Sequence, residues 1–170
     1  MHAYCLFCQT QKCKSIAMTL EKQCILRAFA PQIYKRQRIR GKIEDKLFDL
    51  LPGYIFLFSE KALENLGCFR GIDGIIRRIG TPENHFELAG SDYDFAMNLY
   101  RKEGLVGQVK VYKEGDTVRM EDPLFNGCSG RITQIDYRKQ RARVEYQFAG
   151  MSCFTWIACD LISDEPQHEE

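Results

Sequence analysis

The run of residues 54–58 constrains the fold of this chain more than any other feature of its sequence. All five residues are apolar, and the run follows a Pro52-Gly53 turn. Successive side chains of a β-strand point to opposite faces, so the run predicts a strand with three aromatic side chains on one face. Ile55 and Leu57 point the other way and pack under helices. The aromatic face is either core or, if helices cover only the other face, an open interaction surface. Its members are Tyr54, Phe56 and Phe58.

The first hundred residues predict a sheet with helices on one face. Strands are expected at residues 3–8 and 74–79, with a hairpin at 33–50 that turns at 40–42. Apolar spacing predicts helices over 12–27 and from Ser91 through Tyr100, and Ser59 is expected to cap a short helix that Gly67 ends. The expected strand and helix order classifies this part as α+β.

From Tyr112 onward the pattern changes to short strands and glycine turns. Residues 141–148 alternate strictly between polar and apolar, which predicts a half-buried strand. We expect a small all-β barrel over about residues 112–162. The expected domains are 1–102, a linker at 103–111, the barrel at 112–163 and an acidic tail at 164–170.

Charge is distributed unevenly along the chain. The net charge is +1, but residues 160–170 hold five acidic and no basic residues, so the rest of the chain is basic. A basic body is compatible with nucleic-acid contact. No apolar run is long enough to span a membrane, and the start of the chain lacks a secretory signal, so a cytoplasmic protein is expected.

Signals of catalysis or metal binding are weak. No glycine-rich phosphate loop is present, and none of the three histidines pairs with a nucleophile at a recognisable spacing. Cys5 and Cys8 would face opposite sides of the expected strand and could not share a metal ion. We expect no enzyme activity, no cofactor and no metal, and buried free thiols for most of the eight cysteines. A cysteine-based metal or redox protein stays as an alternative.

Two motifs in this order resemble the NusG family of transcription elongation factors. The first is residues 51–57 after a basic hairpin; the second is residues 114–119 followed by 127–136 and 144–150. The resemblance covers about residues 2–162. It implies an N-terminal NusG domain with a ferredoxin-like α/β sandwich and a C-terminal KOW β-barrel. Residues 36–46 followed by Leu51-Pro52 are similar to specialised paralogues of the RfaH type, and residues 130–150 are similar to a KOW barrel of the general NusG and LoaP type.

The resemblance also implies a mechanism and partners. The N-terminal domain would dock on the clamp helices of RNA polymerase, suppress pausing and promote read-through of terminators as a monomer. The implied docking residues are Phe7, Tyr54, Phe56 and Ile79. Arg70 would approach the non-template DNA strand, and the hairpin would add phosphate contacts through Arg36, Arg38, Arg40 and Lys42. Ribosomal protein S10 or Rho would be partners of the KOW domain.

A second class of function is an RNA- or ribosome-binding module built on the barrel. Alternation along residues 141–148 turns two arginines outward, beside further basic residues, and a solvated strand explains them equally well. The candidate residues are Arg138, Lys139, Arg141 and Arg143. In this alternative the barrel is an adaptor that couples transcription to translation. It is compatible with the first class, since a nascent RNA hairpin could recruit an antiterminator.

Overall fold

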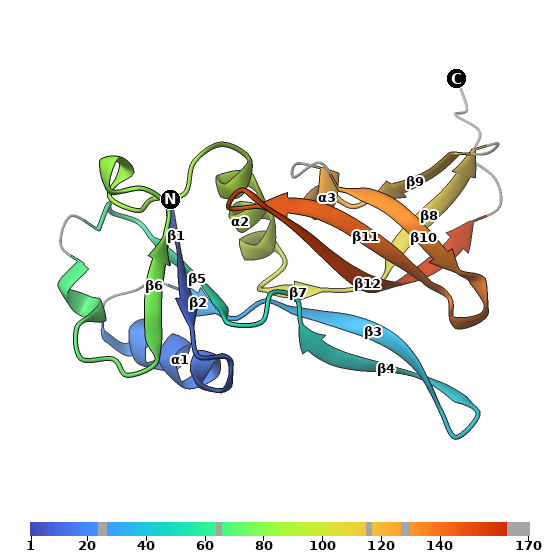
Figure 1. The fold of residues 1–170 in the computed structure, drawn as a ribbon, viewed down its shortest axis with the longest axis horizontal. Helices are drawn as coiled ribbons and strands as arrows, with labels where there is room; N and C mark the ends of the chain where they lie inside the picture. The colour runs from blue at the N-terminus through green and yellow to red at the C-terminus, as the bar shows by residue number, and fades with distance from the viewer. Residues whose placement is uncertain (24–26, 64–65, 115–116, 127–129, 163–170) are drawn as a thin grey trace. The chain divides into compact units, whose positions relative to one another are not determined.

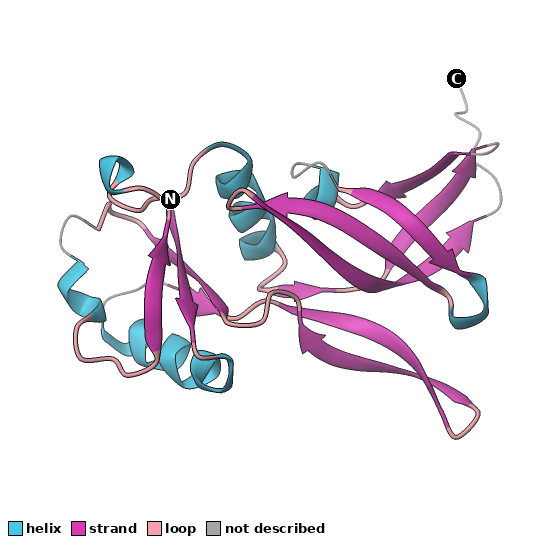
Figure 2. Cartoon of the chain, viewed as in Figure 1, coloured by secondary structure: helices cyan, strands magenta, loops and turns pink. Residues whose placement is uncertain are grey.

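The computed structural model describes residues 1–23, 27–63, 66–114, 117–126 and 130–162. The chain divides into two compact units. The first holds residues 1–32 and 49–105, and the second holds residues 33–48 and the chain from residue 106. Helices and strands alternate in the first unit, whereas strands dominate the described part of the second (Figures 1 and 2). The chain is therefore α+β, as the sequence predicts.

The first unit is built on a four-stranded sheet with the order β2-β5-β1-β6. β1 is antiparallel to both β5 and β6, and β2 pairs antiparallel with β5. β5 lies inside the sheet because all of its side chains are buried and need neighbours on both sides. The strands are β1 (His2–Cys8), β2 (Arg27–Phe29), β5 (Tyr54–Ser59) and β6 (Ile75–Ile79).

Helices cover both faces of this sheet, which corrects the expectation of helices on one face. α1 (Cys13–Gln23) packs on the face that carries Ile55 and Leu57. α2 (Gly90–Arg101) lies on the opposite side and meets the aromatic residues of β5 (Figure 1). The physical reason is that β5 is apolar on both faces, so each face needs a cover that excludes water.

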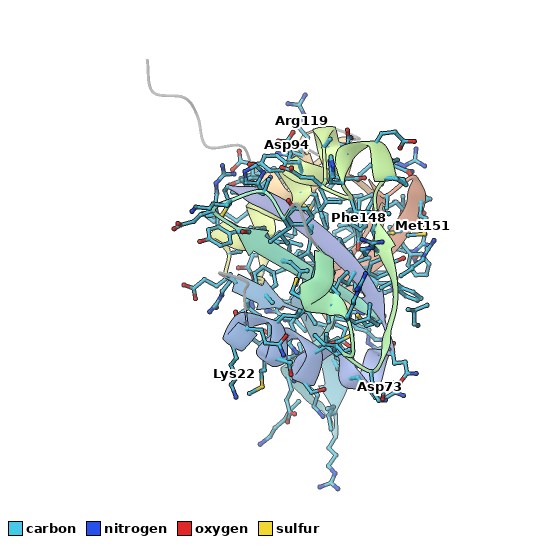
Figure 3. All side chains as sticks on the ribbon, turned by 90° about the vertical axis from the view of Figure 1, so that its left-hand side faces the viewer. Lys22, Asp73, Asp94, Arg119, Phe148 and Met151 are labelled. Atoms are coloured by element: carbon cyan, nitrogen blue, oxygen red, sulfur yellow. The ribbon has the colours of Figure 1, made fainter. Side chains whose placement is uncertain are left out.

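The other elements of this unit differ from the expected ones at three points. The strand β2 was not expected, since residue 27 was assigned to the first helix. The helix expected at 12–27 ends at Gln23, and residues 24–26 lie outside the described part. Residues 60–63 are not helical, and the Ser59 hydroxyl donates to the carbonyl of Lys61 (2.7 Å); residues 64–65 of the expected helix lie outside the described part. The expected helix is reduced to a 3-10 turn at Leu66–Phe69, with others at Thr10–Lys12 and Pro82–Asn84. Figure 3 labels Asp73, which pairs with Lys12 just before α1.

The second unit begins with the predicted hairpin of β3 (Gln32–Ile39) and β4 (Lys42–Asp49). Arg40 and Gly41 form its turn, and both have positive φ. β7 (Leu105–Val106) lies on the other side of β3, so the sheet order is β4-β3-β7. The linker expected at 103–111 thus contains β7 and the start of β8.

The chain from residue 109 forms a five-stranded sheet of order β10-β11-β12-β8-β9. β12 is parallel to β8, and the other neighbours are antiparallel. β9 and β10, at the two ends of this order, also lie close together, so the sheet curls into a half-barrel. Its elements are β8 (Val109–Glu114), β9 (Thr117–Glu121), α3 (Pro123–Asn126), β10 (Arg131–Asp136), β11 (Arg141–Phe148) and β12 (Met151–Ile162).

The core of the curled sheet lies on one face of β11. Ala142, Val144 and Tyr146 are buried, and the Phe125 ring of α3 meets the Tyr146 ring at 5.5 Å between centroids. Each compact unit is made of segments that are separate in the sequence, since residues 33–48 belong to the second unit. The expected domain boundaries therefore stay a prediction about which parts of the chain fold independently. The expected acidic tail lies outside the described residues. No helix of the described part has the length and apolar character needed to cross a membrane.

Candidate functional site

The aromatic face of β5 is closed by α2 over most of its length. Phe56 is fully buried and lies 6.0 Å from the Phe95 ring, between centroids. Phe58 is equally buried, 4.8 Å from the ring of Tyr100. Of the two alternatives that the pattern leaves open, the structure selects core at these two residues, because α2 supplies an apolar cover. Phe56 cannot itself be a contact of an outside partner in this structure.

The open end of the same face lies at the start of β5. Phe7 is half-buried, whereas Tyr54 is buried with an exposed fraction of 8%. Their ring centroids are 5.0 Å apart, and the Arg77 guanidinium carbon lies 5.7 Å from the Phe7 centroid. Phe7 and Arg77 are direct partners in the β1–β6 register, which places both on this face. We call Phe7, Tyr54 and Arg77 the Phe7–Tyr54 surface.

The Pro-Gly turn before β5 sets the position of the Phe7 ring. The carbonyl of Gly53 accepts a hydrogen bond from the Cys8 amide (2.7 Å), which ties the turn to β1. Gly53 has φ +88°, and a Cβ there would lie 2.8 Å from the Phe7 ring. Only glycine adopts this backbone without strain and lets the ring approach so closely. Ile79, opposite Cys5 in the register, is buried behind this surface.

The expected nucleic-acid residues fall into two groups. Arg70, Arg38, Arg40 and Lys42 are exposed. Arg36 is different: it keeps only 8% of its surface and donates from Nε to Asp45 (2.9 Å) and from Nη1 to Gln140 (2.9 Å). The hydrogen bond that Arg36 donates to the Asp45 carboxylate raises the pKa of Arg36 and lowers the pKa of Asp45. Arg36 therefore connects the hairpin to the curled sheet and is poorly placed to meet a phosphate.

The cysteines of the first strand lie on opposite faces, as alternation predicts. Cys8 belongs to the core under α1, and Cys5 is buried on the other side. Burial raises the pKa of Cys8 to about 12 and that of Cys5 well above its usual value. Such thiols stay protonated at neutral pH and are weak ligands and nucleophiles. Among the described residues, no group of three potential metal ligands comes together.

Two of the basic residues expected on the curled sheet, Arg141 and Arg143, stack over aromatic rings. The guanidinium carbon of Arg141 lies 4.4 Å from the Trp156 ring centroid, and that of Arg143 lies 4.3 Å from the Phe154 centroid. We call these four residues the stacked face. Arg138 and Lys139 are exposed in the turn between β10 and β11.

Sequence reasoning missed Arg77, Phe154 and Trp156. In β12 both alternating sets contain apolar residues, so the pattern does not tell which set faces the core. The alternating pattern of β11 contained a useful signal. Its arginines mark the outer face of β11, and residues of β12 that pair with outward-facing residues of β11 lie on the same face, as Trp156 does opposite Arg143.

Comparisons with known proteins agree with these features. A family model described as "Transcription termination factor nusG" matches residues 1–95. The "Transcription termination/antitermination protein NusG" of Buchnera aphidicola subsp. Baizongia pistaciae (strain Bp) is 27% identical over 115 residues, 66% of this chain and 62% of that protein. The protein of the same name from Vibrio cholerae serotype O1 is 26% identical over 113 residues, 65% of this chain and 60% of that relative. The matches thus span less than two thirds of these relatives.

Proposed function

This chain belongs to the NusG family, and from that premise we propose that it is an elongation and antitermination factor that binds the clamp helices of RNA polymerase through the Phe7–Tyr54 surface. Proteins of this family are transcription factors and not enzymes. The proposal includes suppression of pausing and read-through of terminators.

The observation that carries the proposal is the half-buried Phe7 ring beside the exposed Arg77 side chain, with the buried Tyr54 ring packed against Phe7. Aromatic and arginine side chains on a rigid support dominate protein interfaces, and this surface combines both. Phe7 supplies ring surface with the exposed Arg77 beside it, and the buried Tyr54 ring, 5.0 Å from Phe7 between centroids, supports it from behind. Phe56 and Ile79 act as positioning residues that hold β5 and β6 in place from inside the core.

Such a factor works by differential binding and needs no reacting group. It favours the elongating state of the polymerase to the extent that it binds that state more tightly than the paused state. A difference of about 1–3 kcal/mol changes the equilibrium between the two states by about 5- to 150-fold. One aromatic anchor and one arginine are sufficient for a difference of this size.

The proposal extends to the other partners that the resemblance implies. The curled sheet acts as a KOW domain with ribosomal protein S10 or Rho as its partner, and the protein works as a monomer and a specialised paralogue of the RfaH or LoaP type. The exposed cations of the first unit and of the hairpin contact the non-template DNA strand through phosphate groups. Those residues are Arg70, Arg38, Arg40 and Lys42.

The test is transcription in vitro by bacterial RNA polymerase on a template with one pause site followed by an intrinsic terminator. We expect shorter pauses and more read-through when the protein is present. An unchanged pause lifetime and unchanged termination, with polymerase saturated by the protein, would contradict the proposal.

Binding of this protein and its variants to isolated clamp helices tests whether the Phe7–Tyr54 surface is the contact. We expect Phe7→Ala combined with Arg77→Ala to weaken binding by at least about tenfold, because both change side chains at the open end. Met18→Ala is the matched control, since Met18 is an exposed residue of α1 on the other side of the sheet. Equal losses in both variants, with circular dichroism unchanged, would remove the Phe7–Tyr54 surface from the interface.

A further inference from the structure

The outer face of β11 and β12 carries aromatic residues that the polymerase contact does not use. On β11 the apolar residues at even positions are buried, so the residues at odd positions face outward. The register pairs Arg143 with Trp156 and Glu145 with Phe154, which brings these four side chains to one face. Phe154 is 61% exposed, the largest such value for an aromatic on this sheet apart from Tyr137 in the adjacent turn.

Arginine and ring side chains alternate along this face. Arg141 reaches over Trp156, which lies opposite Arg143 in the register, and Arg143 in turn reaches diagonally over Phe154. The order along the strands is therefore guanidinium, indole, guanidinium, phenyl. The two rings are two residues apart on β12, about 7 Å at the rise of a β-strand.

Two carboxylates hold the arginines in this arrangement. Glu145 accepts from Arg143 (2.9 Å) and from Arg131 (3.3 Å), and Asp136 accepts from Arg141 (3.1 Å). Residues 131–156 contain no other acidic residue but hold five basic ones, so this segment carries a net charge of +3. The basic residues are Arg131, Arg138, Lys139, Arg141 and Arg143.

We propose that the stacked face binds single-stranded RNA, with bases on Phe154 and Trp156 and phosphates near Arg138 and Lys139. Aromatic rings on a positively charged sheet are the features that proteins use to bind single strands without strong sequence preference. Guanidinium planes are also stacking surfaces for bases. A spacing of about 7 Å accommodates two successive bases that are splayed apart rather than stacked on each other.

Charge and polarity favour RNA over a protein partner. The rings are separated by guanidinium groups and flanked by polar side chains such as Thr133 and Gln147, so they form no continuous apolar patch. The same polar side chains offer partners to a ribose 2′-hydroxyl, the group that distinguishes RNA from DNA. This inference does not depend on the proposed polymerase contact, because its residues lie in the other compact unit.

Fluorescence anisotropy with the full-length protein tests the proposal. The probe is a fluorescein-labelled, unstructured RNA of about 12 nucleotides, within the site sizes of small single-strand-binding domains. We expect binding that weakens with salt, and weaker binding of single-stranded DNA of the same sequence and of duplex RNA. Trp156 is the only tryptophan of the chain, so a change in its emission on RNA addition would report stacking directly.

The variants separate stacking from charge. Phe154→Ala combined with Trp156→Ala is expected to weaken RNA binding by at least about tenfold. Phe154→Tyr combined with Trp156→Phe keeps both rings and is the matched control, with affinity within about threefold of the parent. Arg138→Gln combined with Lys139→Gln is expected to weaken binding and lower the salt slope by about 2. If the double variant does not fold, Phe154→Ala alone replaces it in the test, because this variant changes only an exposed side chain. It is also expected to weaken RNA binding.

Several results would overturn the proposal. They are no binding of single-stranded RNA by the parent protein, equal binding by a folded variant without the rings, and equal affinity for single-stranded DNA. Ring-dependent binding to RNA polymerase without any RNA binding would assign the face to a protein instead. Ring variants that lose RNA binding but still bind the clamp helices would support the proposal separately from the polymerase contact.

Discussion

β5 and β12 both carry aromatic residues two positions apart, yet the two rows have different surroundings. On β5, α2 covers the row with Phe95 and Tyr100, and Phe56 and Phe58 become core. On β12, Phe154 stays 61% exposed, and arginines from the neighbouring strand lie over Phe154 and Trp156. An alternating aromatic pattern therefore identifies a strand face, but what packs on that face decides whether it stabilises the fold or meets a partner.

The strongest test of this comparison is the removal of one ring from each row. We expect Phe56→Ala to lower the free energy of unfolding by about 3–5 kcal/mol, because it leaves a cavity between the sheet and α2. Phe154→Ala is expected to cost less than about 1 kcal/mol, since the ring is already in water. Urea denaturation of both variants measures the difference. Similar losses would show that the Phe154 ring is covered in solution.

A backbone substitution sharpens the comparison at the open end of β5. Gly53→Ala is expected to cost about 2 kcal/mol and to displace Phe7, because it combines a positive φ with a Cβ placed against the ring. Gly41→Ala is the matched control: its φ is +84°, but no atom lies within 4 Å of the added Cβ. We expect a cost of about 1 kcal/mol there. Thermal unfolding measures the stability of both variants. An equal loss of stability would mean that the Phe7 ring moves away from the added Cβ without an energetic penalty.

The smallest expected effect concerns the arginine cover of β12. Arg141→Gln removes a cation–π contact and an ion pair on a partly exposed face, so we expect a cost of about 0.5–1 kcal/mol. Its clearer consequence is stronger quenching of Trp156 fluorescence by acrylamide, because the indole loses its cover. Lys110→Gln, an exposed residue of β8, is the control for charge removal. Unchanged quenching would show that Arg141 does not cover the indole.

Much of the fold was predictable because its signals are local. The β5 strand follows from Pro52-Gly53 and five apolar residues, and the β3–β4 hairpin follows from its polar turn at Arg40 and Gly41. The helix expected after Ser59 failed because the hydroxyl bonds to the carbonyl of Lys61 instead of a helical amide. A single sequence does not distinguish these two hydrogen-bonding choices, since both satisfy the same side chain.

The candidate site was predicted in part for the same reason. Strand alternation placed Tyr54 and Phe56 on one face, and the NusG resemblance added Phe7. The register places Phe7 opposite Tyr54, and only the Phe7 end of this face is open. The hairpin arginines were counted as equivalent cations, whereas Arg36 is buried against Asp45 and Gln140. The Gln140 contact joins residues 104 positions apart, so no local pattern could reveal it.

The sequence by itself determined the longer strands of the first unit and the hairpin, the change of pattern near residue 112 and the NusG resemblance, because apolar periodicity and turn residues act over a few positions. The short strands β2 and β7 were not predicted. Only the tertiary structure decided which faces stay exposed. α2 closes the Phe56 side of the sheet, and β11 places arginines over Phe154 and Trp156. The physical reason is that burial depends on contacts between residues far apart in the chain, and these exist only once the elements have packed.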